Sequence, residues 1–248
     1  PLGELLVYSG GGYYYPDDEK QGLIDEMQRT RDLGYRLCKM KIGGADLETD
    51  RRRIEWALSV VGDGDNLAVD ANGRFGLDEA LAYGRMVAEF GLCWFEEPVD
   101  PLDYRAHAVL ADELDVDIAT GENLFSVQDY RNLLRHGGLR PTRDWLQPDP
   151  ALAYGLTECL EIIALAEAMG WSRTRVVPHG GHQMGLHMAI GLGLGGTESY
   201  PGVFRPYGGF ADDAEIVNGL IKPPQEPGLG IEAKSELFAD IQRNLGLD

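Results

Sequence analysis

Short apolar runs alternate along the chain with longer amphipathic stretches, from residue 4 to about residue 200. The apolar runs have the length and composition of buried strands, and they cover residues 4–9, 36–42, 66–72, 92–98, 116–123, 144–149, 175–180 and 196–201. Between them the pattern predicts helices, most clearly over 78–90 and 156–169. Gly34, Gly91 and Gly170 each stand just before an apolar run, where glycine commonly ends a helix.

This alternation predicts an α/β fold with a parallel sheet. Eight apolar runs favour a closed TIM-type (β/α)7β parallel barrel over residues 1–210, with an open doubly wound sheet as the alternative. The rhythm stops near Gly208, and residues 211–248 hold prolines and glycines followed by one helix pattern over 235–245. We expect this C-terminal extension to pack against another part of the protein, because it does not add a further strand–helix unit.

Charge and cysteine content narrow the possible partners. The chain has 248 residues with a net charge of −19, which repels nucleic acids and anionic membranes, so neither is an expected partner. No apolar run approaches the roughly 18 residues of a membrane span. Cys38, Cys93 and Cys159 form no CxxC pair, which favours reduced thiols and a cytoplasmic location.

An ionisable residue stands at the C-terminal end of most predicted strands. Lys39 and Lys41 are the first of them. The series that follows Lys41 at intervals of 19 to 30 residues is Asp70, Glu96, Glu122, Asp149, His179 and Glu198. The carboxyl ends of parallel barrel strands meet at one mouth, where the active sites of such barrels lie. We therefore expect these side chains to converge on one site.

Asp70, Glu96 and Glu122 come from three successive predicted strands. Such oxygen ligands suit Mg²⁺, which prefers carboxylates and keeps positions for water or substrate. Each carboxylate alone is also compatible with capping the helix that follows it. Three carboxylates at one mouth repel one another unless a cation joins them, so we predict that they bind Mg²⁺.

Lys39 and Lys41 are two residues apart in a predicted strand, so both side chains point to the same face. Cys38 and Met40 then point toward the helices. Two inward ammonium groups beside a cation are expected to lower each other's pKa, which would help one of them act as a base. The alternative is a surface pair on a frayed strand end, which the apolar run RLCKMKI disfavours.

Asp149 and His179 are predicted to end neighbouring strands, across the mouth from the two lysines. A carboxylate beside an imidazole selects its tautomer and raises its basicity. A substrate held at the mouth then has lysine on one face and histidine on the other. His182 follows three residues after His179 and is a candidate supporting residue.

Asn72 and Asn123 stand close to two of the predicted ligands along the chain. Either amide is placed to contact a substrate or to hold its own loop by local hydrogen bonds. Glu97 has the opposite strand parity to Glu96, which suggests that it supports the site from behind or pairs with Lys39 or Lys41.

Gly191, Gly193 and Gly196 form a GxGxxG string, the motif of dinucleotide-binding proteins. That motif must follow a strand and open a helix, whereas this string follows a helical pattern and leads into a strand. We therefore interpret these glycines as close-packing positions. A zinc hydrolase barrel is also disfavoured, because residues 1–15 contain no histidine for an HxH motif on the first strand.

The ordered set of motifs resembles the mandelate racemase branch of the enolase superfamily across essentially the whole chain. The matching stretches are KMK at 39–41, VDAN at 69–72, FEEP at 95–98, TGEN at 120–123, PD at 148–149 and PHG at 178–180. The resemblance implies that Glu96, and not Glu97, is a metal ligand and that Glu198 hydrogen-bonds the substrate carboxylate. The loop stretches GGYYYP, PHGGHQM and PYGGF further resemble the D-tartrate dehydratases of that branch.

The resemblance implies a lyase, a Mg²⁺-dependent hydro-lyase that removes water from a small hydroxy-diacid or sugar acid. Lys41 would take the α-proton, Lys39 would offset the carboxylate charge, and His179, held by Asp149, would protonate the leaving hydroxyl. The expected reaction converts D-tartrate to oxaloacetate. The alternatives are another sugar-acid dehydratase, a racemase of the same superfamily, or an inactive metal-binding barrel.

Members of the branch carry an N-terminal α+β capping domain that closes over the barrel mouth, and no stretch of this sequence matches it. We expect residues 211–248 to be the part that packs against such a cap. With its cap, the protein is expected to form a homo-oligomer.

Overall fold

Strands and helices alternate through most of the chain, and the computed structural model describes residues 3–247. The parallel strands are β1 (Leu5–Gly11), β2 (Leu37–Lys41), β3 (Leu67–Asp70), β4 (Phe95–Glu96), β5 (Ile118–Thr120), β6 (Trp145–Leu146) and β7 (Thr197–Ser199). The helices are α1 (Glu19–Asp32), α2 (Leu47–Val61), α3 (Leu77–Ala88), α4 (Tyr104–Glu113), α5 (Val127–His136), α6 (Leu156–Ala168), α7 (Gln183–Leu192) and α8 (Ser235–Leu245). The remaining elements are the 3-10 turns η1 (Gly64–Asn66), η2 (Arg173–Arg175) and η3 (Ile231–Ala233) and the short strands β8 (Ile216–Val217) and β9 (Leu220–Ile221).

Local sequence explains where several helices begin and end. The Asp46 side chain accepts a hydrogen bond from Thr49 N (2.8 Å) at the start of α2, where backbone N–H groups lack partners in the helix. Gly34 and Gly170 have φ values of +93° and +91°, in the left-handed region that glycine enters without steric cost. These glycines therefore end helices, as predicted.

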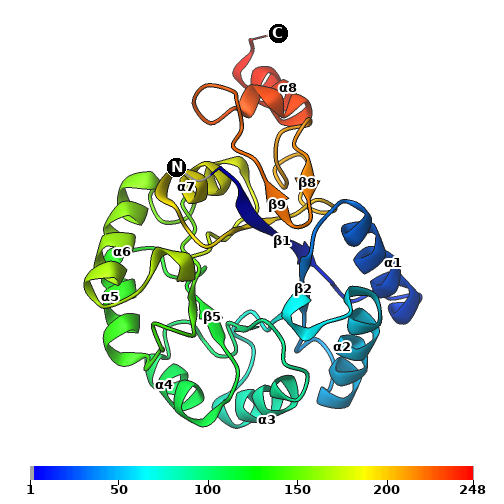
Figure 1. Ribbon diagram of the computed structural model, residues 1–248, viewed down its shortest axis with the longest axis vertical. Helices are drawn as coiled ribbons and strands as arrows, with labels where there is room; N and C mark the ends of the chain where they lie inside the picture. Colours follow the sequence, from blue (N-terminus) through cyan, green and yellow to red (C-terminus); the bar gives the residue numbers. More distant parts are fainter. Residues whose placement is uncertain (1–2, 248) are drawn as a thin grey trace.

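Parallel pairing connects the strands in chain order, and β1 pairs with both β2 and β7. Between β6 and β7 the connection runs through residues 176–178, where Val177 N donates to Leu146 O (2.9 Å) and Glu198 N donates to Pro178 O (3.2 Å). The first and last parallel strands are thus neighbours, with helices outside them (Figure 1). This is an α/β fold with a mostly parallel sheet, as predicted.

One predicted strand, over 175–180, forms only a single bridge, between Val176 and Leu146. Pro178 has no N–H group to donate to a neighbouring strand, which limits regular pairing in this segment. The segment nevertheless lies between β6 and β7, so His179 reaches the same edge of the sheet as the other strand-end residues.

Side chains of β2 alternate between the two faces of the sheet. Cys38 and Met40 belong to the core between strands and helices, whereas Leu37 belongs to the cluster inside the strands. Lys39 and Lys41 share the parity of Leu37 and point inward, as expected from the two-residue repeat of a strand. One strand therefore contributes to packing on one face and to the site on the other.

The C-terminal segment is attached to the sheet by the β8–β9 hairpin. Leu5 of β1 pairs with Ile221 of β9 in antiparallel register, and the Ile221 side chain is buried. Helix α8 then extends beyond the ring of helices (Figure 1). The sequence pattern predicted α8 but not the hairpin, because strands of two residues have too few positions for an alternating pattern.

The GxGxxG string is a helix end followed by a strand, as predicted. Gly193 ends α7 in the left-handed conformation (φ +69°), and a side chain at Gly196 would lie 3.0 Å from the Leu6 carbonyl oxygen. A side chain at Gly191 would meet no atom of residues 3–247 within 4 Å. Close packing therefore explains only part of the string.

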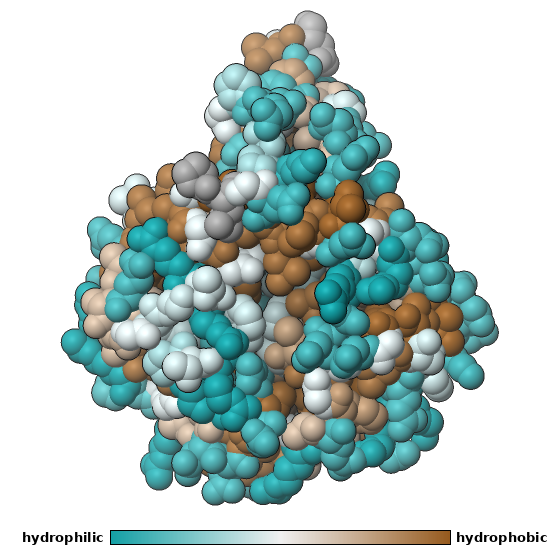
Figure 2. All heavy atoms as spheres, viewed as in Figure 1, coloured by the Kyte–Doolittle hydropathy of each residue, from teal (hydrophilic) through white to brown (hydrophobic). Residues whose placement is uncertain are grey.

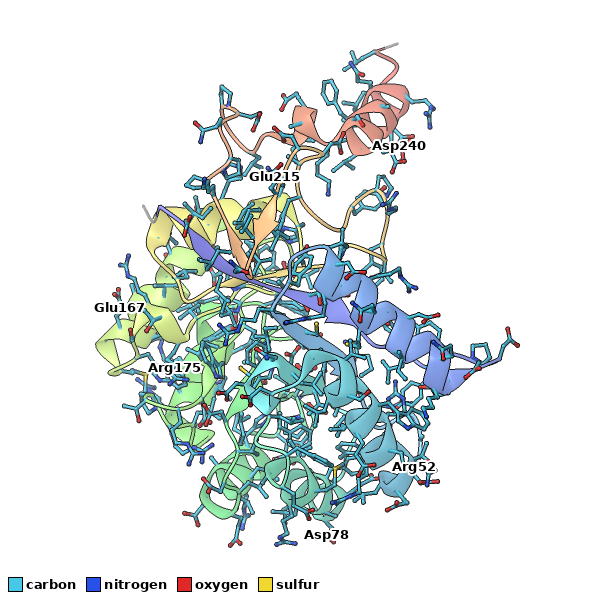
Figure 3. The ribbon with its side chains drawn as sticks, turned by 45° about the vertical axis from the view of Figure 1, so that its right-hand side comes forward. Arg52, Asp78, Glu167, Arg175, Glu215 and Asp240 are labelled. Atoms are coloured by element: carbon cyan, nitrogen blue, oxygen red, sulfur yellow. The ribbon has the colours of Figure 1, made fainter. Side chains whose placement is uncertain are left out.

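On the face shown in Figure 2, hydrophilic residues cover much of the rim, while apolar residues gather toward the middle. Charged side chains such as Arg52 and Asp78 project outward from the surrounding helices (Figure 3). None of the helices within residues 3–247 combines the length and the apolar character that crossing a membrane requires.

Candidate active site

Three carboxylates meet at the carboxyl ends of neighbouring strands. Asp70 ends β3 and pairs in register with Glu96 of β4, and Glu122 lies just past β5. One oxygen from each lies within 4.8 Å of the others, and all three residues are buried. Burial raises the pKa of Glu96 well above its usual range, although Lys39 lowers it. Full ionisation of the cluster is therefore unfavourable unless a cation offsets its charge.

This carboxylate cluster fits a divalent cation. The Oε2 atom of Glu122 is buried and makes no hydrogen bond within residues 3–247. A buried carboxylate oxygen without a hydrogen bond is costly unless a positive charge lies beside it. His179 Nε2 lies 3.4 Å from this oxygen, and a bound cation would add a direct ligand contact. Mg²⁺ prefers carboxylate oxygens and completes its coordination with water or substrate. Asp70, Glu96 and Glu122 are therefore the residues that would hold Mg²⁺.

The two lysines of β2 differ in access to solvent. Lys39 Nζ forms ion pairs with Glu96, with Glu198 Oε1 (2.8 Å) and with Asp70 Oδ2 (3.4 Å), and the residue is 1% exposed. Lys41 Nζ lies 2.5 Å from Asp70 Oδ2, and its side chain is 12% exposed. Lys39 is thus enclosed by carboxylates, whereas Lys41 borders open space.

Neither lysine has the lowered pKa that their proximity predicted. Burial lowers the pKa of Lys41 and Asp70 raises it, with a smaller lowering by Lys39, and the result lies above its ordinary value. Burial also opposes the charge of Lys39, but Glu198 and Glu96 raise its pKa well above the usual range. The prediction assumed a cation beside the lysines. Without one, the buried carboxylates outweigh the repulsion between the two ammonium groups.

Asp149 orients the imidazole of His179. The His179 Nδ1 atom lies 2.9 Å from Asp149 Oδ2, and its Nε2 atom faces the carboxylates, 3.4 Å from Glu122 Oε2 and 3.6 Å from Glu198 Oε2. Burial lowers the pKa of His179, but Glu198, Asp149 and Glu122 together raise it to about 9. The imidazole is therefore held in its protonated form, with Nε2 directed into the site.

His182 lies beside this pair. Its Nδ1 atom accepts a hydrogen bond from Gly185 N (3.2 Å) at the start of α7, and its Nε2 atom lies 3.5 Å from Asp149 Oδ1. The structure thus places His182 next to the Asp149–His179 pair, in the supporting position expected from the sequence.

Glu198 and Asn72 both lie within the site. Glu198 of β7 is fully buried, and its Oε2 atom accepts a hydrogen bond from Gly180 N (3.0 Å). Asn72 donates from Nδ2 to Glu122 Oε1 (3.2 Å) and lines a pocket beside the carboxylates. Asn72 is therefore within reach of a molecule in the pocket, whereas the buried Glu198 is not among the residues that line it.

Asn123 is directed toward Glu97. Its Nδ2 atom donates to both carboxylate oxygens of Glu97, at 3.0 and 2.8 Å, and among the described residues it does not line the pocket. Glu97 pairs with neither lysine, because its backbone takes a left-handed turn (φ +40°) that directs its side chain elsewhere. Burial and the nearby Glu122 raise the pKa of Glu97 to about 8.

A pocket of about 410 Å³ adjoins the carboxylates. Lys41, Glu122 and His179 line it together. Its wall is completed by aromatic residues that the sequence pattern did not reveal, namely Tyr13, Tyr200, Phe204 and Tyr207. These residues lie on loops, whose positions periodicity does not predict. For Tyr13 the only available signal was the stretch GGYYYP, singled out by resemblance.

Two further residues hold Glu96 in place and were not predicted. Trp94 Nε1 (2.8 Å) and Gln147 Nε2 (2.7 Å) both donate to Glu96 Oε2. Trp94 precedes Glu96 by two residues, and Gln147 precedes Asp149 by two residues. Because side chains alternate along a strand, this spacing was the signal that could have found them.

Comparison with known proteins finds relatives over most of the chain. The family model described as enolase C-terminal domain-like matches residues 22–237. Arabinonate dehydratase of Saccharolobus solfataricus is 32% identical over 253 residues, which cover 96% of this chain and 64% of that protein. Cycloisomerases are also among the relatives of this chain. The chain thus spans less than two thirds of the length of these relatives.

Solved structures share the fold. L-talarate dehydratase from Polaromonas sp. JS666, complexed with Mg and L-glucarate, has a TM-score of 0.77 and 29% identity, covering 93% of this chain and 62% of its own. A racemase from Streptomyces coelicolor with bound magnesium has a TM-score of 0.78 and 30% identity, covering 92% and 60%. Magnesium in these neighbours confirms the cofactor predicted from the carboxylate pattern.

Proposed function

The chain belongs to the enolase C-terminal domain-like family of the enolase superfamily, and we propose that it is a Mg²⁺-dependent dehydratase of hydroxy-diacids or sugar acids. One observation carries the proposal: Lys41, Glu122 and His179 line a single pocket. Elimination of water needs one group that takes a proton and another that gives one, beside a site that binds the acid.

We assign removal of the α-proton to Lys41. Its Nζ atom borders the pocket, and its amine can accept the proton from the carbon next to the substrate carboxylate once it has lost its own proton. Asp70 raises the pKa of Lys41, and a cation held by Asp70 would offset that carboxylate charge and favour the neutral amine. Lys39 is enclosed by Glu96, Glu198 and Asp70, so its ammonium group is suited to offsetting carboxylate charge.

His179 gives the proton to the leaving hydroxyl. Because Asp149 binds Nδ1, Nε2 is the nitrogen directed toward the pocket. The C–O bond at the β-carbon breaks as Nε2 transfers its proton, and the hydroxyl leaves as water. The proton taken by Lys41 balances the one given by His179, and the enol product becomes a 2-keto acid by tautomerisation.

The remaining side chains bind and orient. Asp70, Glu96 and Glu122 would hold the cofactor, and a bound Mg²⁺ would polarise the substrate carboxylate and offset these three charges. Glu198 and Asn72 are the proposed contacts to the substrate. Asn123 would act indirectly, through the Glu97 carboxylate that it binds.

Within this class we propose D-tartrate as the substrate and oxaloacetate as the product. The loop stretches that support this assignment by resemblance, GGYYYP and PYGGF, supply Tyr13 and Tyr207 to the pocket wall. A racemase would use the same lysine and histidine without loss of water, and it is the second candidate because a racemase is among the similar structures.

We further infer that the strands form a TIM-type (β/α)7β barrel over residues 1–210. Pairing of β1 with both β2 and β7 supports this inference. Residues 211–248 would then be an extension against which a capping domain packs.

A substrate screen tests the proposed function. The protein with Mg²⁺ is incubated with the three tartrate stereoisomers, galactarate and arabinonate, and 2-keto acid is measured together with deuterium uptake from solvent. We expect D-tartrate to give 2-keto acid fastest, and EDTA to abolish the product. Deuterium uptake without 2-keto acid would favour the racemase, and Mg²⁺ binding with neither would contradict both activities.

A further inference from the structure

Lys234 lies outside the site pocket, yet its ammonium group contacts the loop that forms one wall of that pocket. Its Nζ atom donates to the carbonyl oxygens of Tyr207 (2.8 Å), Gly208 (3.0 Å) and Gly209 (2.9 Å). An ammonium group has three N–H donors, so these carbonyls use all of them. Lys234 is only 4% exposed, which means that the contact is built into the fold and is not a surface encounter.

The contacted segment, residues 200–209, is here called the aromatic loop. It leaves the sheet directly after β7. Three of its side chains line the site pocket, those of Tyr200, Phe204 and Tyr207. Gly209 N donates to Gly181 O (2.9 Å), which joins the loop to the turn that follows His179. A shift of this loop would therefore change the pocket wall next to the proposed acid.

Packing alone holds the aromatic loop weakly. Phe204 and Tyr207 are 58% and 63% exposed, and Phe204 has a left-handed φ of +58° that disfavours an L-residue. A second cavity of about 390 Å³ flanks the loop, and Gly208 lines both cavities. With hollow space on two sides, the loop depends on hydrogen bonds for its position.

Lys234 is itself held in place by the C-terminal segment. Asp212 N donates to Ala233 O (2.9 Å), Ser235 N donates to Asp212 Oδ2 (3.1 Å), and Phe238 N donates to Lys234 O (2.9 Å). Burial lowers the pKa of Lys234, opposed by Asp212. The three carbonyl groups therefore stabilise a charge that burial disfavours, and they fix the distance between loop and extension.

We propose that Lys234 is a positioning residue that holds the aromatic loop in the conformation that completes the substrate pocket. It touches no reacting atom and acts through the loop. Turnover as a readout rests on the proposed function, whereas the order of the loop can be measured without any substrate. Without Lys234 the loop would have to become ordered when substrate binds. Immobilising its two exposed aromatic side chains, Phe204 and Tyr207, then weakens substrate binding about tenfold.

The test compares Lys234→Met, which keeps the side-chain length but removes the donors, with Lys222→Met, which changes an exposed lysine of the same C-terminal segment. Hydrogen–deuterium exchange is followed in peptides covering 200–209 and in peptides from α2 to α4. We expect faster exchange in 200–209 only for Lys234→Met. On the best substrate, KM should rise about tenfold while kcat changes less than about threefold.

Unchanged exchange in 200–209, or an equal rise throughout the protein, would overturn the proposal. If Lys234→Met does not fold, Lys234→Arg replaces it, since a guanidinium group keeps the charge but cannot match three carbonyls arranged around one nitrogen. For Lys234→Arg we expect exchange in 200–209 to rise, but less than complete loss of the three hydrogen bonds would cause. No rise in this segment would contradict the proposal. A local rise in a protein that turns over none of the acids would leave this inference standing and reject the proposed function.

Discussion

Charge balance among a few buried side chains governs the site at the scale of single residues. Lys39 forms ion pairs with Asp70, Glu96 and Glu198, and all four side chains are excluded from water. Removing one member of such a group leaves the other charges buried, which commonly costs more than the pair contributed. Each substitution here therefore needs a measurement of unfolding beside the measurement of function.

Amide replacements test the metal ligands. We expect Asp70→Asn, Glu96→Gln and Glu122→Gln each to lower Mg²⁺ affinity by more than about tenfold, a change of about 1.4 kcal/mol, because each removes a charged oxygen ligand. Isothermal titration calorimetry measures the affinity. Glu161→Gln, at an exposed position on α6, is the matched control and should leave affinity unchanged. Equal affinity in all four variants and the wild type would remove the carboxylates from the proposed metal site.

The proposed base and acid should fail in different ways. Either loss should slow dehydration by about 10²- to 10⁴-fold. Lys41→Ala should also lose exchange of the α-proton with deuterated solvent, because no other group is assigned to take that proton. His179→Asn should retain some exchange, since Lys41 can still remove and return the proton.

Proton NMR in D2O separates the two steps. The reverse pattern, with exchange surviving in Lys41→Ala and lost in His179→Asn, would require the two roles to be swapped. Circular dichroism of both variants checks that the fold is retained.

At the scale of elements, Arg53 of α2 connects the ends of β1 and β2. It is fully buried and donates to Lys41 O (2.6 Å), Gly12 O (2.9 Å) and Tyr13 O (3.2 Å). Its guanidinium group also lies 3.7 Å from the centre of the Tyr14 ring. The Arg53 side chain therefore positions both Lys41, the proposed base, and Tyr13, which lines the pocket beside it.

We expect Arg53→Met to lower the free energy of unfolding by about 3–5 kcal/mol, because three carbonyl groups and the carboxylates of Glu19 and Asp50 lose a buried partner. Urea unfolding followed by circular dichroism measures this change. Arg52→Met is the control, since Arg52 projects from the outer side of α2 (Figure 3) and should change stability by less than about 0.5 kcal/mol. Similar effects of the two substitutions would mean that Arg53 does not connect these elements.

At the scale of the whole molecule, burial should suppress the reactivity of the cysteines. Burial raises the pKa of Cys38 to about 11 and those of Cys93 and Cys159 to about 12. Thiolates are the reactive form, and at pH 8 less than about 1% of each thiol would be ionised. Labelling with a thiol reagent at pH 8 should therefore be slow for the folded protein and should accelerate as the pH rises toward these pKa values.

Cys93 gives the sharpest comparison, because it is only half-buried and a small reagent can approach it. All three thiols should react rapidly once guanidinium chloride unfolds the chain. Rapid labelling of Cys93 at pH 8 in the folded state would contradict the raised pKa.

The sequence by itself determined the features that depend on local periodicity. Lys39 and Lys41 point inward because side chains alternate along a strand. Asp70, Glu96, Glu122 and His179 recur once in each strand–helix unit, so a parallel sheet brings them to one edge whatever the details of packing. The α/β fold, the carboxylate cluster and the Mg²⁺ cofactor followed from these two repeats.

Only the tertiary structure decided the features that depend on contacts between distant loops and on the sum of buried charges. Asn123 turns to Glu97, and the lysines keep raised pKa values, because carboxylates from several strands surround them. The aromatic loop meets Lys234 of the C-terminal segment through backbone carbonyls, which carry no signature of side-chain type. Side-chain periodicity encodes which face a residue takes, whereas the partner it meets there depends on how the whole chain closes.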